Sequence, residues 1–162
     1  MAKLYWENFS AGQVLQFGST LVTAQEIKAF AAEFDPQPMH LDEMAASATL
    51  VGGLCASGWH TGCMMMRMVA DGFVLNSSSL GATGIEEMRW LAPVRPGDRL
   101  SVRVTVLETT ESKSRPERGF VRARFEVFTA TGICVLTAVA NLIFGRRLGA
   151  ARARAAQAIE QP

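Results

Sequence analysis

The chain carries almost no excess charge. Its 162 residues include 16 Lys and Arg against 15 Asp and Glu, for a net charge of +1. Proteins that bind nucleic acid usually show a strong basic excess, so no nucleic-acid partner is predicted. No run of uncharged apolar residues approaches the ~18 of a membrane-spanning helix. Residues 1–9 also lack the apolar stretch of a signal peptide. We therefore expect a cytoplasmic protein with no membrane partner.

Histidine and cysteine are also scarce, with two and three residues respectively. There is no Cys-x-x-Cys motif and no paired-histidine spacing, so a metal site is not expected. The cysteines are odd in number and lie in apolar stretches, at Cys55, Cys63 and Cys134. This usage predicts reduced thiols in the core rather than a disulfide framework.

The rest of the composition is typical of a folded domain. Hydrophobic residues make up 49% of the chain and charged residues 19%, which argues against disorder. The length favours one domain with a sizeable core. We assign this domain to residues 1–145 and an Ala/Arg-rich tail to residues 146–162.

The first half of the chain is predicted to be mostly helical. After a strand at residues 14–22, Thr23 and Glu26 have the spacing of a capping box, which marks a helix start. The helix must end at the two prolines that follow, and residues 41–48 favour one or two further helical turns. The helix that starts at Thr23 has an apolar face with helical spacing, formed by Ile27, Phe30, Ala31 and Phe34.

Residues 56–73 are the most apolar helix candidate. Ser57 suits the N-cap position and Gly58 the first helical residue. Almost no polar face remains, so we expect this helix to be buried nearly all round. Its central methionines are interpreted as adaptable core filling, at Met64, Met65, Met66 and Met68.

The second half is rich in strands, with candidates at residues 84–91, 100–107, 120–129 and 134–144. Two of them alternate apolar and polar residues, and a polar linker at 108–119 separates these two. Short connections favour antiparallel pairing. The sequence therefore predicts an α+β fold in which an antiparallel sheet wraps around a central helix. Pairing of edge strands across a homodimer would hide an exposed sheet edge.

An acid and a histidine stand on one proline-braced segment. Asp35 and Gln37 each precede a proline, so we expect residues 34–40 to stay out of a helix, with a stiff loop from Asp35 to Pro38. Such a loop can hold Asp35 and His40 in fixed relation around a water or a substrate. The alternative is a helix-terminating turn with a surface Asp and a packed His.

Four segments give the chain a specific resemblance: FDPQPMHLD at 34–42, LCASGWHT at 54–61, EMRWLAPVRPGD at 87–98 and SKSRP at 112–116. They resemble the MaoC-like dehydratases, the (R)-specific enoyl-CoA hydratases of the hotdog-fold superfamily. The family motif Asp-x-Asn-Pro-x-His maps its catalytic pair onto Asp35 and His40, with Gln37 in place of the usual Asn. The resemblance implies a hotdog fold and reversible syn addition of water to a trans-2-enoyl-CoA.

The resemblance also implies roles for other residues. The backbone N–H of Gly58 would stabilise the enolate oxygen at the helix N-terminus. Ser57 would be either a substrate-binding residue or a plain N-cap. Lys113 and Arg115 would either bind the phosphates of coenzyme A or lie on a solvated loop. His60 is predicted to be packed rather than catalytic.

Two other functions stay open. A hotdog thioesterase would use a carboxylate to direct water at the thioester carbonyl. A non-catalytic acyl-thioester-binding subunit would have no need of both Asp35 and His40. The hydratase is our preferred interpretation. It needs no metal or redox cofactor, since coenzyme A is part of the substrate, and it is expected to be a homodimer or a higher homo-oligomer.

Overall fold

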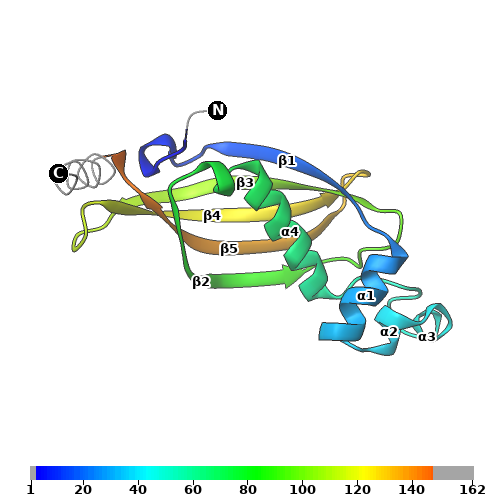
Figure 1. The fold of residues 1–162 in the computed structure, drawn as a ribbon. Coiled ribbons are helices and arrows are strands. Elements are labelled where there is room, and N and C mark those ends of the chain that lie inside the picture. The colour runs from blue at the N-terminus through cyan, green and yellow to red at the C-terminus, as the bar shows by residue number, and fades with distance from the viewer. Residues whose placement is uncertain (1–2, 148–162) are drawn as a thin grey trace, which may run out of the picture.

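A computed structural model describes residues 3–147 of the chain. Five strands form one antiparallel sheet in the order β1-β3-β4-β5-β2. The 15-residue helix α4 (Gly58–Gly72) lies across one face of the sheet, which curves around it (Figure 1). The predicted sheet around a central helix is therefore confirmed. The strands are β1 (Val14–Leu21), β2 (Ser79–Trp90), β3 (Arg99–Glu111), β4 (Arg118–Thr129) and β5 (Cys134–Gly145).

Alternation along the strands decides which face of the sheet meets the helix. Successive side chains of a strand point to opposite faces, so every second residue of β3 and β4 enters the core. The β3 residues predicted to share one face are all buried, as are their β4 counterparts. They pack with the buried side of α4 in a single cluster that includes Leu100, Val102, Val104, Val106, Val121, Ala123, Phe125, Val127, Met64, Met65, Met68 and Val69.

Three short helices cover the end of the sheet where α4 begins (Figure 1). They are α1 (Ala24–Phe34), α2 (Pro38–Leu41) and α3 (Glu43–Ser47). The capping box predicted for α1 is present, because the backbone N–H of Glu26 donates to Thr23 Oγ1 at 3.2 Å and Thr23 N–H donates to Glu26 Oε2 at 3.2 Å. Asp42 caps α3 by accepting a hydrogen bond from the N–H of Ala45 at 2.7 Å.

Two predictions about local structure are wrong. The segment from residues 34 to 40 is not wholly non-helical, because Pro38 begins α2 and His40 lies within that turn. Proline suits the first position of a helix, where its fixed φ is correct and no N–H is needed. The linker expected at 108–119 is much shorter, since β3 and β4 pair as far as Glu111 and Gly119.

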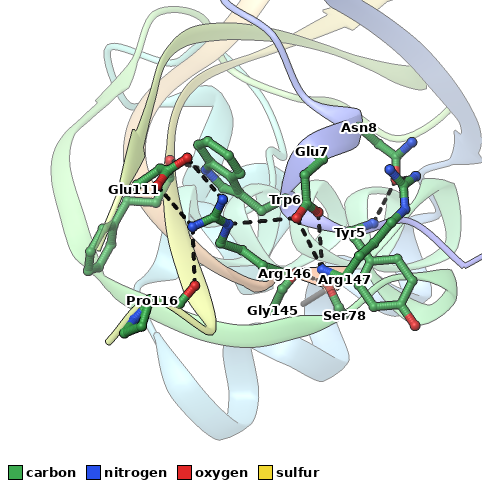
Figure 2. Close-up of polar contacts among 11 residues, drawn as sticks. Tyr5, Trp6, Glu7, Asn8, Ser78, Glu111, Pro116, Gly145, Arg146 and Arg147 are labelled. Atoms are coloured by element: carbon green, nitrogen blue, oxygen red, sulfur yellow. Dashed lines mark hydrogen bonds and ion pairs between the residues drawn. The ribbon is translucent and has the colours of Figure 1, made fainter. Parts of the chain in front are cut away.

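The two ends of the described chain are tied together (Figure 2). The guanidinium of Arg146 makes two hydrogen bonds of 2.9 Å to Glu111, lies 3.6 Å from Glu7 and stacks over Trp6. The N–H of Arg147 donates to Glu7 at 3.1 Å. Trp6 and Glu7 belong to a 3-10 turn, η1 (Trp6–Asn8), so this network joins the N-terminal turn, β3 and the end of β5. The remainder of the predicted tail lies outside the described residues.

Helix α4 is not buried all round, contrary to the prediction. Trp59, Cys63 and Met66 are exposed along one side of it in this chain. Cys63 therefore does not lie in the core, whereas Cys55 is buried and Cys134 is half-buried, and none of the three is in a disulfide.

No helix within residues 3–147 is long and apolar enough to cross a membrane.

Two neighbouring methionines of α4 provide a first prediction. Met65 is 6% exposed and Met66 is 49% exposed. Met65→Ala is expected to lower the free energy of unfolding by about 2–5 kcal/mol, because it leaves a cavity in the core. Met66→Ala, the matched control, should cost clearly less at a protein concentration where the chain is monomeric. Chemical denaturation of both variants measures the difference, and equal costs would contradict the assignment of Met65 to the core.

Candidate active site

A cavity of about 430 Å³ lies at the N-terminus of α4. The turn after α1, the helix α2 and the residues that follow β2 form its walls. Three of the residues singled out from the sequence line it, namely Asp35, His40 and Gly58. The fold thus brings the predicted pair to the start of the central helix.

Asp35 ends helix α1 and has both carboxylate oxygens engaged. Its Oδ2 accepts a hydrogen bond from Ser57 Oγ at 2.6 Å, and its Oδ1 accepts one from Gln37 Nε2 at 2.8 Å. The Ser57 hydroxyl, and then the Gln37 amide, hold the pKa of Asp35 below its usual value. Asp35 is therefore a carboxylate at neutral pH. Gln37, which departs from the usual family residue, still supports this carboxylate.

His40 lies on α2 and is 4% exposed. Its Nδ1 is 2.8 Å from the carbonyl oxygen of Cys55, which can only accept a hydrogen bond. Nδ1 therefore carries the proton in the neutral ring, and Nε2 presents a lone pair. Nε2 is 3.6 Å from Asp35 Oδ2, a separation too long for a direct hydrogen bond between them. One water bound there could donate a hydrogen bond to each of the two acceptors.

Ser57 has one of the two roles that the sequence left as alternatives, the N-cap, while substrate binding stays a prediction. Its Oγ accepts from the N–H of Trp59 at 3.2 Å, so it caps α4 as predicted. The same hydroxyl donates to Asp35. Ser57 therefore links the helix start to the carboxylate.

Gly58 is the first residue of α4, where a backbone N–H has no acceptor within the helix. The indole of Trp90 packs directly against it, since a Cβ on Gly58 would come within 2.6 Å of the ring. Trp90 in turn makes an edge-on contact with Trp59, their ring centroids 5.4 Å apart. Glycine is therefore required here for the approach of the indole, a contact that the sequence did not reveal.

Lys113 and Arg115 lie elsewhere. They belong to the turn between β3 and β4, at the end of the sheet opposite to α1–α3 (Figure 1). Neither residue lines the cavity in this chain. Their predicted contact with coenzyme A phosphates stays a prediction.

His60 packs outside the cavity, as expected. Its ring stacks on Phe30 with centroids 4.7 Å apart, and within residues 3–147 its buried Nδ1 has no hydrogen-bond partner. Burial lowers the pKa of His60, with a smaller opposing effect from Glu26. The folded protein thus disfavours protonation of this ring.

The lowered pKa of His60 gives a prediction on pH. The unfolded chain binds a proton near the ordinary pKa of 6.5, while the folded chain resists it. Stability should therefore be highest above that pH and fall as the pH drops from 6.5 toward the lower folded pKa. His60→Phe, which keeps a ring against Phe30, should reduce this loss. Denaturation at a series of pH values measures it, and the same loss in both proteins would exclude His60 as its cause.

Comparison with known proteins identifies the family of the segment that forms this site. The family model described as the MaoC like domain matches residues 8–130, which include Asp35, His40 and Gly58. The chain belongs to the MaoC-like domain family.

Relatives of this MaoC-like chain match it over most of its length. The uncharacterized protein YdeM of Bacillus subtilis (strain 168) is 30% identical over 141 residues, covering 86% of this chain and 98% of YdeM. The crystal structure of a MaoC-like dehydratase from Rhodospirillum rubrum is 41% identical, covers 89% of this chain and 98% of that one, and has a TM-score of 0.83. The R-hydratase PhaJ1 from Pseudomonas aeruginosa is 24% identical, with 90% and 88% coverage and a TM-score of 0.71. This last likeness shows the fold alone, and the expected hotdog fold is confirmed.

Three residues have a role in this MaoC-like site that was not predicted from the sequence. The carbonyl of Cys55 orients His40, the indole of Trp90 covers Gly58, and Gln37 supports Asp35. Gln37 and Trp90 lie inside the segments that carried the family resemblance. Every residue has a backbone carbonyl, so the sequence could not show that the carbonyl of Cys55 contacts His40.

Proposed function

We propose that this protein is an (R)-specific enoyl-CoA hydratase that also catalyses the reverse dehydration of 3-hydroxyacyl-CoA. One observation carries the proposal: Asp35 Oδ2 and His40 Nε2 are 3.6 Å apart at the N-terminus of the central helix. Membership of the MaoC-like family and the likeness to a MaoC-like dehydratase support it. The (R) stereochemistry follows the resemblance and the name of the R-hydratase that shares the fold.

The protonation states suit hydration. Asp35 is held as a carboxylate, and in the neutral form of His40 the lone pair lies on Nε2, so the two can accept both hydrogens of one water. Such a water has its oxygen lone pairs directed away from the pair and toward a substrate in the cavity. The two residues act as one proton-transfer unit.

The step is balanced by proton transfers alone. The water oxygen forms a bond to C3 of the enoyl thioester while the Asp35–His40 unit takes one of its protons. The C2–C3 π electrons move to give an enolate, whose oxygen accepts a hydrogen bond from the N–H of Gly58. The unit then returns a proton to C2 on the same face. No electron enters or leaves overall, so the step calls for no redox cofactor.

The test compares two thioesters. With crotonyl-CoA we expect loss of the enoyl absorbance and formation of (R)-3-hydroxybutyryl-CoA without free thiol. With butyryl-CoA, the saturated control, we expect no reaction. Thiol release from butyryl-CoA, together with no hydration of a panel of enoyl thioesters, would favour the thioesterase and overturn the hydratase.

A homodimer is part of this proposal. Within residues 3–147, no strand pairs with the outer edge of β2. Apolar side chains beside this edge are exposed, including Met66 at 49% and Ile85 at 55%. A largely apolar cavity of about 350 Å³ lies between α4 and this strand. A second copy that pairs its own β2 with this edge would cover both, in an arrangement with two-fold symmetry.

The dimer is testable by light scattering after size exclusion. The native chain should have twice the monomer mass, and Ile85→Arg should shift it to the monomer mass. Val14→Arg is the matched control, because Val14 is similarly exposed on the opposite edge strand β1. A native monomer, or a dimer that Ile85→Arg leaves intact, would contradict this interface.

A further inference from the structure

The half-buried side chain of Arg95 holds the loop that leads into α4. Its guanidinium donates hydrogen bonds to two carbonyl oxygens of that loop, through Nη2 to Val51 and through Nη1 to Leu54, the second at 3.4 Å. Gly53 makes room for this contact, because a Cβ there would be 3.1 Å from Nη1. The flat fork of an arginine can bind two carbonyls at once, which a lysine cannot do in the same geometry.

The next residue of the loop is Cys55, whose carbonyl orients His40. The Cys55 N–H donates to the carbonyl of Met39 at 3.5 Å, and its own carbonyl accepts from His40 Nδ1 at 2.8 Å. The following N–H, of Ala56, donates to the carbonyl of Val94 at 2.8 Å. Residues 54–56 therefore lie between the His40 helix on one side and residues 94–95 on the other.

The base of the arginine is itself fixed. The backbone N–H of Arg95 donates to Asp98 Oδ2 at 2.7 Å, and the carbonyl of Asp98 accepts from the N–H of Val22 at 2.8 Å. The turn that carries Arg95 is thus anchored to the end of β1. A side chain that is anchored in this way can set the position of the loop it contacts.

We infer that Arg95 is a positioning residue for His40: it fixes the Leu54–Cys55 backbone so that the Cys55 carbonyl holds the His40 ring with its proton on Nδ1 and its lone pair toward Asp35. The role rests on the proposed function, since the lone pair on Nε2 is what accepts a proton from water. A histidine whose other nitrogen has lost its acceptor populates both tautomers, and the Nε2–H form cannot serve as the base.

The experiment reads the tautomer directly and needs no substrate. Long-range ¹H–¹⁵N spectra at a pH where both histidines are neutral distinguish a protonated ring nitrogen from a bare one. The chain has two histidines, so His40→Gln identifies the signals of His40 by their loss. Arg95→Met removes both donors but keeps an unbranched apolar stem. Arg99→Met is the matched control, because Arg99 is exposed and its guanidinium contacts Ser19.

We expect the native protein and Arg99→Met to show His40 as the Nδ1–H tautomer, and Arg95→Met to show a mixture. With crotonyl-CoA, Arg95→Met should lower kcat about 10–100-fold, the range for a displaced catalytic group, with a smaller change in KM. The kcat of Arg95→Lys should lie between that of the native protein and that of Arg95→Met. If Arg95→Met does not fold, the same two measurements, the His40 tautomer and kcat, are made on Arg95→Lys.

An unchanged tautomer in the arginine variants would overturn the inference, whatever their kcat. A changed tautomer with native kcat would also overturn it, since the position of the ring would then not matter to the reaction. The proposed function fails separately: a shifted tautomer in a protein that never hydrates enoyl-CoA would leave the role of Arg95 in place and reject the hydratase.

Discussion

Asp35→Asn and His40→Gln are each expected to lower kcat for enoyl-CoA hydration by roughly 10²–10⁴-fold, the usual contribution of a general acid or base. Both replacements nearly keep the shape of the side chain. An amide at position 35 can still accept from Ser57 but no longer carries the negative charge that the Ser57 and Gln37 hydrogen bonds support. An amide at position 40 cannot take up a proton at neutral pH.

The double variant should be little slower than the slower single variant, because the two residues handle the same water and act as a unit. Steady-state kinetics with saturating crotonyl-CoA measures all three. Asp42→Asn is the matched control for the acid, since Asp42 caps α3 and asparagine is an equally good cap. Near-native turnover in either single variant would remove that residue from the mechanism.

Gly58→Val is expected to reduce kcat/KM by about 10²-fold or more, the size of a spoiled oxyanion site. The backbone of Gly58 is helical, without a positive φ, so a side chain is compatible with the local conformation. It is not compatible with the position of Trp90, whose ring atoms come within 2.6 Å of a Cβ at Gly58. The indole must move, and the wall of the cavity around the donor N–H changes with it.

Gly62→Ala provides the control for this variant. Gly62 lies one turn further along α4, and a Cβ there makes only an ordinary contact with Met88, at 3.7 Å. Thermal melts and hydration kinetics should show a folded Gly58→Val with low activity and an active Gly62→Ala. Trp90→Ala in the Gly58→Val background tests the steric explanation, since removal of the ring should restore part of the activity. A Gly58→Val protein that melts and hydrates normally would show that the thioester carbonyl binds elsewhere.

Predictions from the sequence succeeded where one residue's role depends on its near neighbours in the chain. The alternation in β3 and β4, the capping box of Thr23 and Glu26, and the Ser57 N-cap are all present. Each depends on spacing within one element, because periodicity and caps are local properties. Asp35 and His40 could be proposed as a pair for the same reason, since both residues belong to one short segment.

Two local predictions failed, at α2 and in the linker at 108–119, and the predictions of burial failed because burial depends on the whole fold. Met66 and Cys63 are as apolar as their buried neighbours in α4, yet both are exposed in this chain. The sequence of one helix does not state how much of its surface the sheet of the same chain covers. That surface is left for a partner in the proposed dimer.

The sequence by itself determined most of the elements, the core face of β3 and β4, and the short segment that brings Asp35 and His40 together as a proposed pair. The tertiary structure alone decided how that pair is held. The Cys55 carbonyl reaches His40 across 15 positions, and Arg95 reaches the Val51 carbonyl across 44. Backbone carbonyls are the same in every residue, so only the packing of distant segments sets which carbonyl meets which donor, and with it the tautomer of His40.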